Sequence, residues 1–150
     1  MESINFDRGY KTYAINGDEN NVIRVNLADQ NLMTRAAEVM TALDEFKEEL
    51  KSGAVTDAAE IYDRADKLLK EKFDYAFGKG TAAAVFGDLH FMTVANDDGE
   101  CIFETFMKAF LPVAERDIAE AAGRQKKHIA DLVDAGKLDA VADSIKGAAT

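Results

Sequence analysis

The stretch that decides the fold class, residues 22–50, reads VIRVNLADQNLMTRAAEVMTALDEFKEEL. Its first part alternates, so that Ile23, Val25 and Leu27 fall on one face, as in a half-buried β-strand. After Asp29 the apolar residues recur at intervals of three and four, which is the period of an amphipathic helix. A strand that is followed directly by a long helix predicts an α+β fold.

A second β-prone segment, Tyr10–Ile15, precedes this strand, and the sequence NGDENN at Asn16–Asn21 separates the two. Asn and Gly tolerate positive φ, so these residues favour a turn. We therefore expect an N-terminal β-hairpin whose loop is longer than two residues. Ile4 and Phe6 are candidates for a short strand before it. Because a lone hairpin is marginal in water, this one needs helices, or the hairpin of another subunit, to pack against.

Two charged amphipathic helices are expected next. The first begins after an N-cap at Asp29 and ends at Gly53, and the second is capped by Thr56. The short linker between them favours an antiparallel helical hairpin. The apolar stripe of the second helix is Ala58, Ile61, Ala65, Leu68, Leu69 and Phe73. Its outer, solvated face is Asp63, Arg64, Asp66, Lys67, Lys70 and Glu71.

The remaining chain also predicts helices. A short one runs from about Thr81 toward Phe91, with Gly87 weakening its middle. After a turn at 96–99, a Phe-rich helix follows, and Pro112 is expected to kink or restart it. The helical pattern then continues to Gly136.

A single domain is expected from 150 residues. It divides into an N-terminal β-hairpin at 1–28, a helical body at 29–136, and a C-terminal part at 137–150. That last part holds a short helix, marked by Leu138, Val141 and Ile145, and a frayed tail. The fold class is thus α+β, a mostly α-helical single domain with an N-terminal hairpin.

The charge balance excludes several partners. The chain has 18 basic and 28 acidic side chains, a net charge of −10, with −6 in residues 1–75 and −4 in residues 76–150. No half carries the basic surface that binds nucleic acid or an acidic membrane. The single cysteine, Cys101, excludes an intrachain disulfide. With no signal peptide in MESINFDRGY and no apolar run of about 18 residues, the expectation is a cytoplasmic protein.

No catalytic, metal or cofactor site is expected. The two histidines, His90 and His128, lack the Glu-x-x-His spacing of a helical metal site, and His90 is expected at a helix end. The loop at 96–100 does not match a calcium loop, because Val94 would occupy its first ligand position. Cys101 is expected to be buried and not reactive, since no base is identifiable near it.

The aromatic segment offers the candidate binding residues. Seven phenylalanines lie between residues 73 and 110. They form either the core of the domain or an exposed groove for an apolar segment of a partner, and the sequence does not separate the two. The candidates for partner binding are Phe86, Phe91, Phe103, Phe106 and Phe110.

The order of motifs from about Ile4 to Pro112 resembles a protein family. After the hairpin and the helix pair come FG at 77–78, VFG at 85–87 and DGE at 98–100. IFETF at 102–106 and LP at 111–112 follow. This order is similar to that of tail assembly chaperones of tailed phages and prophages of Gram-positive bacteria.

The resemblance implies a non-enzymatic phage tail assembly protein. Its partner would be the tape measure protein or another tail protein, bound in the cytoplasm of the bacterial host during tail morphogenesis. It also implies self-association along the client and a frameshifted longer form. A second function stays open from the charge alone, an acidic inhibitor or DNA mimic that acts on a nucleic-acid enzyme.

Overall fold

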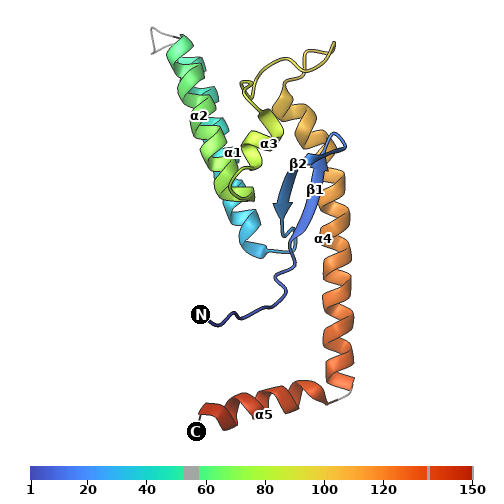
Figure 1. Cartoon of the computed structure of the whole chain (residues 1–150). Coiled ribbons are helices and arrows are strands. Elements are labelled where there is room, and N and C mark those ends of the chain that lie inside the picture. Colours follow the sequence, from blue (N-terminus) through green and yellow to red (C-terminus); the bar gives the residue numbers. More distant parts are fainter. Residues whose placement is uncertain (53–57, 135, 150) are drawn as a thin grey trace. The chain divides into compact units, whose positions relative to one another are not determined.

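The computed structural model describes residues 1–52, 58–134 and 136–149. Their contacts divide into two compact units, Met1–Pro112 and Val113–Thr150. Two antiparallel strands are followed by helices, which confirms the α+β, mostly helical fold class (Figure 1). The elements are β1 (Lys11–Ile15), β2 (Asp18–Val25), α1 (Gln30–Ser52), α2 (Ala58–Phe77), α3 (Thr81–Phe86), α4 (Ile102–Asp134) and α5 (Lys137–Ala149).

The hairpin is confirmed, but its turn is tighter than expected. Only Asn16 and Gly17 connect the strands, and residues 18–21 belong to β2. Both turn residues have positive φ, 52° and 75°, which matches the right-handed twist of the flanking strands. The expectation of a longer loop is therefore wrong. The short strand expected around Ile4 and Phe6 is also wrong, because residues 1–10 form no strand.

The helical hairpin is confirmed. Asp29 caps α1, since its Oδ1 accepts a hydrogen bond from the Asn31 N–H at 2.9 Å. Two ion pairs, Arg64–Glu49 at 3.0 Å and Lys72–Glu38 at 3.2 Å, join α1 to α2. The earlier residue of α1, Glu38, pairs with the later residue of α2, Lys72, so the two helices are antiparallel. The expected stop at Gly53 and the expected cap at Thr56 lie outside the described residues.

The short helix α3 ends earlier than expected. Gly87 ends it after Phe86, with φ 56° and its N–H donated to the Ala83 carbonyl, and does not merely weaken its middle. At the other end Gly80 has no capping side chain. Asp74 of α2 supplies the cap instead, because its Oδ1 accepts a hydrogen bond from the Ala82 N–H at 2.8 Å. The second helix therefore holds the third one in place.

The hairpin packs on this helical body. Ile23, Val25 and Leu27, the face expected to be half-buried, are all buried. The Asn21 side chain donates a hydrogen bond to the Ala84 carbonyl at 2.9 Å, which ties β2 to α3. A lone hairpin is only marginally stable in water, and this one packs against helices of its own chain.

The fourth helix is continuous through Pro112, so the expected restart there is wrong. A proline leaves the carbonyl four residues earlier, that of Lys108, without its helical hydrogen bond. Both positions are exposed, so water can satisfy that carbonyl. The last helix is confirmed, but it extends to Ala149, so residues 147–149 are helical and not a frayed tail. Of the helices within the described residues, none has the length and apolar character needed to cross a membrane.

Candidate functional site

The centre of the N-terminal unit is a cluster of phenylalanine rings. Phe73 of α2 is 0% exposed and lies at its middle. Its ring centroid is 4.7 Å from that of Phe77, 5.3 Å from Phe86, 5.7 Å from Phe106 and 6.4 Å from Phe103. Most of these pairs are edge-to-face, the geometry that the ring quadrupoles favour. Three helices, α2, α3 and α4, are therefore joined by one aromatic core.

The candidate binding residues belong to this core. Phe86 and Phe91 are each 2% exposed, and Phe110 is buried as well. Phe103 and Phe106 are half-buried and pack against the same cluster. The structure brings the five together, but as a core and not as an exposed groove, so the groove interpretation is wrong for the three buried rings. The helical spacing of these phenylalanines in the sequence does not show which rings of other helices they contact.

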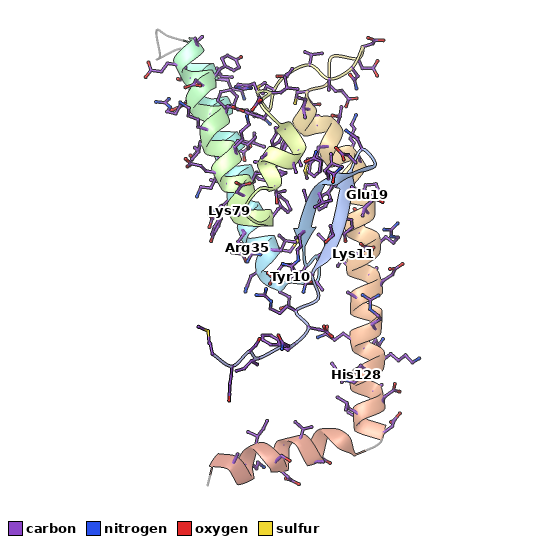
Figure 2. The ribbon with its side chains drawn as sticks, viewed as in Figure 1. Tyr10, Lys11, Glu19, Arg35, Lys79 and His128 are labelled. Atoms are coloured by element: carbon purple, nitrogen blue, oxygen red, sulfur yellow. The ribbon has the colours of Figure 1, made fainter. Side chains whose placement is uncertain are left out.

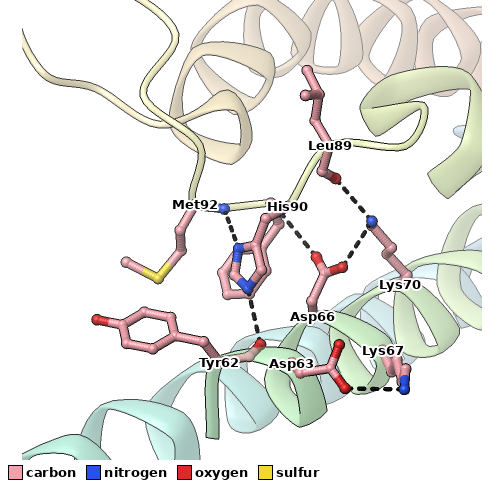
Figure 3. Close-up of polar contacts among 9 residues, drawn as sticks. Tyr62, Asp63, Asp66, Lys67, Lys70, Leu89, His90 and Met92 are labelled. Carbon is pink, nitrogen blue, oxygen red and sulfur yellow. Dashed lines mark hydrogen bonds and ion pairs between the residues drawn. The ribbon is translucent and has the colours of Figure 1, made fainter. Parts of the chain in front are cut away.

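A polar clamp beside this core holds the segment after α3 (Figure 3). Asp66 of α2 accepts a hydrogen bond from the Phe91 N–H at 2.9 Å and pairs with Lys70 at 2.9 Å. Lys70 also donates to the Leu89 carbonyl at 2.8 Å. The side chains of Asp66 and Lys70 are only 17% and 24% exposed. The expectation that these two residues lie on a solvated outer face is therefore wrong, because their charges satisfy loop backbone groups.

His90 completes the clamp and is not at a helix end, since α3 stops at Phe86. Its Nδ1 accepts a hydrogen bond from the Met92 N–H at 3.1 Å. The proton of the neutral ring is therefore on Nε2, which lies 2.8 Å from the Tyr62 carbonyl oxygen and donates to it (Figure 3). Both ring nitrogens are used in holding backbone, so the arrangement is structural.

Cys101 and His128 are the other residues with chemically reactive side chains. Cys101 is buried as expected, and burial raises the pKa of its thiol, which disfavours the reactive thiolate. His128 is an exposed residue of α4 (Figure 2). Within residues 1–52, 58–134 and 136–149, no three His, Cys, Asp or Glu residues are grouped closely enough to hold a metal ion.

An open acidic depression follows the exposed face of α1. Its lining residues are Thr41, Asp44, Glu45, Glu48, Glu49 and Ser52. Two of its carboxylates are already paired, Glu49 with Arg64 and Glu48 with Lys51. Among the described side chains, no buried polar atom lacks a hydrogen-bond partner. The depression therefore contains no buried polar group that lacks a partner.

The exposed apolar residues of the C-terminal unit are a surface that the sequence analysis missed. In α4, Ile118, Ile129 and Val133 are 39%, 49% and 57% exposed, and in α5, Val141 and Ile145 are 53% and 66% exposed. Their helical spacing was visible in the sequence, where it predicted only that these segments are helices. The hydrophobic pattern shows which residues share a face, but it does not show whether anything covers that face.

Net charge is divided unequally between the two units. Residues 1–112 carry 21 acidic and 12 basic side chains, a net charge of −9. Residues 113–150 carry 7 acidic and 6 basic side chains, a net charge of −1. The two halves of the sequence, residues 1–75 and 76–150, differ less in net charge, with −6 and −4. The C-terminal unit is thus nearly neutral and exposes apolar side chains.

Comparisons of the chain with models of protein families, with curated proteins and with solved structures found no match.

Proposed function

We propose that the protein is a non-enzymatic assembly protein that binds an apolar helical segment of a client, as tail assembly chaperones bind the tape measure protein. The observation that carries this proposal is the outward apolar face of α5. Val141 and Ile145 lie four residues apart, about one turn along the helix, and both are more than half exposed. An amphipathic helix binds another helix through such a face.

The charge distribution supports the same role. A chaperone for an aggregation-prone helix must cover apolar surface and keep the complex dispersed. The net charge of −9 on residues 1–112 supplies mutual repulsion between coated complexes. The nearly neutral C-terminal unit imposes little repulsion on an apolar client. In this proposal the C-terminal unit binds the client, and the charge of residues 1–112 keeps the complex in solution.

The test is coexpression with a tape measure protein from a tailed phage of Gram-positive bacteria. The readouts are the soluble fraction of the tape measure protein and its coelution with this protein. We expect the wild type to keep the tape measure protein soluble and to coelute with it. The variant Val141→Asp/Ile145→Asp places charges on the apolar face of α5 and should lose both effects.

The control is Ala140→Asp, which adds one negative charge on another face of α5, where the double variant adds two on the apolar face. It should behave as the wild type does. The proposal is overturned if the wild type neither solubilises nor binds the tape measure protein. It is also overturned if the double variant binds as well as Ala140→Asp. Circular dichroism of each variant confirms that the helices are retained.

A further inference from the structure

Two open hollows on the α1–α2 hairpin share part of their lining. The first is the acidic depression along the exposed face of α1. The second lies between the two helices and is lined by Ala42, Glu45, Phe46, Glu49, Arg64, Ala65 and Leu68. Because Glu45 and Glu49 line both hollows, the two are continuous. Together they form the α1–α2 groove.

The floor of the α1–α2 groove is apolar. Ala42 and Phe46 of α1 are buried, and Ala65 of α2 is half-buried. Leu68 of α2 is 38% exposed, so part of its side chain is in contact with water. Covering exposed apolar surface with another apolar group is favourable. The floor therefore offers a contact for an aliphatic side chain from a partner.

Two ion pairs between the helices flank this floor. Arg64 pairs with Glu49 at 3.0 Å, and Lys72 pairs with Glu38 at 3.2 Å. Leu68 is four residues from each of these two cations, so the three side chains follow one face of α2. The exposed part of Leu68 thus lies between two places where α2 is tied to α1.

Glu45 is the carboxylate of α1 at this level of the groove. It follows Glu38 by seven residues and precedes Glu49 by four, so the three carboxylates share one face of α1. Glu38 and Glu49 are paired with cations of α2, whereas Glu45 has no ion pair with any residue that the structure describes. The groove therefore presents an apolar side chain, Leu68, together with a carboxylate that lacks a cation.

The charge of the groove is negative, and so is the charge of the helices that form it. The lining has a net charge of −3, from four carboxylates and one cation, namely Asp44, Glu45, Glu48, Glu49 and Arg64. All charged residues of α1 and α2 together are ten carboxylates and seven cations, which is also a net charge of −3. Complementary charge across an interface favours association, so the matching partner is basic.

We propose that the α1–α2 groove binds a basic amphipathic segment of a protein partner. Lysine and arginine carry a charged group at the end of an aliphatic stem. Such a stem covers Leu68, and its charged end pairs with Glu45. An amphipathic helix in a groove between two helices presents several such side chains on one face. The groove belongs to the N-terminal unit, so this proposal does not rest on the function proposed for α5.

The test is titration of a fluorescently labelled helical peptide of leucine and lysine with the full chain, followed by fluorescence anisotropy. A length of about 15 residues is enough for the peptide to form a helix. We expect saturable binding that weakens as salt is raised, because exposed charge pairs are screened. Two comparison peptides have glutamine or glutamate in place of every lysine. Both should bind at least about tenfold more weakly.

Two variants, each with a matched control, locate the binding site. Glu45→Lys should weaken binding of the lysine peptide about tenfold, because it replaces an attraction with a repulsion. Glu19→Lys makes the same substitution on the β-hairpin (Figure 2) and should weaken binding by less than about twofold. Leu68→Ala removes the apolar contact and should weaken binding about fivefold. Leu89→Ala truncates a 53% exposed leucine that does not line the groove and should leave binding unchanged.

Four results would overturn the proposal. The first is a lysine peptide that does not bind saturably. The second is a Glu45→Lys variant that binds as well as Glu19→Lys, which would show that the peptide responds only to the overall charge. The third is a Leu68→Ala variant that binds as well as Leu89→Ala. The fourth is a glutamine peptide that binds as tightly as the lysine peptide, which would show that the groove takes an apolar segment without regard to charge.

The client experiment is separate from these measurements. It reports on Val141 and Ile145 of α5, which lie in the C-terminal unit. The variant Val141→Asp/Ile145→Asp should bind the lysine peptide as the wild type does. The two proposals therefore fail independently.

Discussion

Replacing Phe73 with alanine removes the ring at the centre of the aromatic core. This side chain is 0% exposed and contacts the rings of four other phenylalanines, contributed by α2, α3 and α4. No single helix can shift to fill the space, because the remaining rings are held by separate elements. The substitution should therefore destabilise the N-terminal unit by creating a cavity.

The expected magnitude follows from the burial. Phe→Ala substitutions in cores reduce the free energy of unfolding by about 3–5 kcal/mol, and complete burial places Phe73 in the upper part of that range. The total free energy of unfolding of a domain of this size is about 5–15 kcal/mol. With a urea dependence of about 2 kcal/mol per molar, a loss of about 4 kcal/mol lowers the unfolding midpoint by about 2 M.

The assay is urea unfolding followed by far-ultraviolet circular dichroism. The matched control is Phe6→Ala, because Phe6 is the same residue type at a 72% exposed position. Its effect should stay within about 0.5 kcal/mol. Phe103→Ala, at a half-buried ring of the same cluster, should fall between the two. The order Phe73, Phe103, Phe6 is therefore the signature of an aromatic core.

The reasoning is refuted if Phe73→Ala lowers the free energy of unfolding by less than about 1 kcal/mol with an unchanged urea dependence. It is also refuted if Phe103→Ala costs as little as Phe6→Ala. That second result would show that the fourth helix does not contribute to the core.

Three further predictions concern single contacts. Asn21→Ala removes the hydrogen bond to the Ala84 carbonyl and should lower the free energy of unfolding by about 1 kcal/mol, measured by urea unfolding; an unchanged midpoint would mean that β2 is not tied to α3. The hydrogen bond from Arg35, followed by that from the backbone of residue 31, lowers the pKa of Asp29 below its ordinary value of 3.8. A lowered pKa in the folded state means that the unfolded state binds more protons. The stabilisation from Asp29 is therefore present above about pH 4 and is lost as the pH falls through the folded-state pKa. Asp29→Asn should make the urea midpoint fall less on acidification below about pH 4 than it does in the wild type, and an equal fall would contradict the pairing with Arg35. Burial raises the pKa of the Cys101 thiol, so Ellman's reagent at about pH 7 should modify it at least about tenfold more slowly in the folded protein than in urea, and equal rates would show that the thiol is accessible.

The sequence predicted those features that depend on local chemistry. The change of hydrophobic period at Asp29 predicted a strand followed by a helix, because side chains alternate along a strand and recur about every 3.6 residues along a helix. The carboxylate of Asp29 predicted the start of α1, since an N-cap is a contact within about three residues. The sequence also contains the signal for the tight turn, because Asn16 and Gly17 form the Asn-Gly pair that is typical of two-residue hairpin turns. The start of β2 at Asp18 was not predicted, because its first residues are polar and exposed and therefore show no hydrophobic alternation.

The sequence did not predict which apolar faces are covered. Phe86 is buried against Phe73 of α2, and Phe91 against Phe46 of α1, and these contacts join separate elements of the chain. Asp66 looked like a solvated charge because its position on the helix is outside the apolar stripe. Its role depends on the backbone N–H of residue 91, which only the folded chain brings within reach.

The sequence by itself therefore determined the order of the elements and the antiparallel pairing of α1 with α2, because periodicity, caps and short linkers act within a few residues. The tertiary structure alone decided that the phenylalanines form a core while Ile129 and Ile145 stay exposed. The physical reason is that burial is a property of two surfaces in contact, and a hydrophobic period describes only one of them.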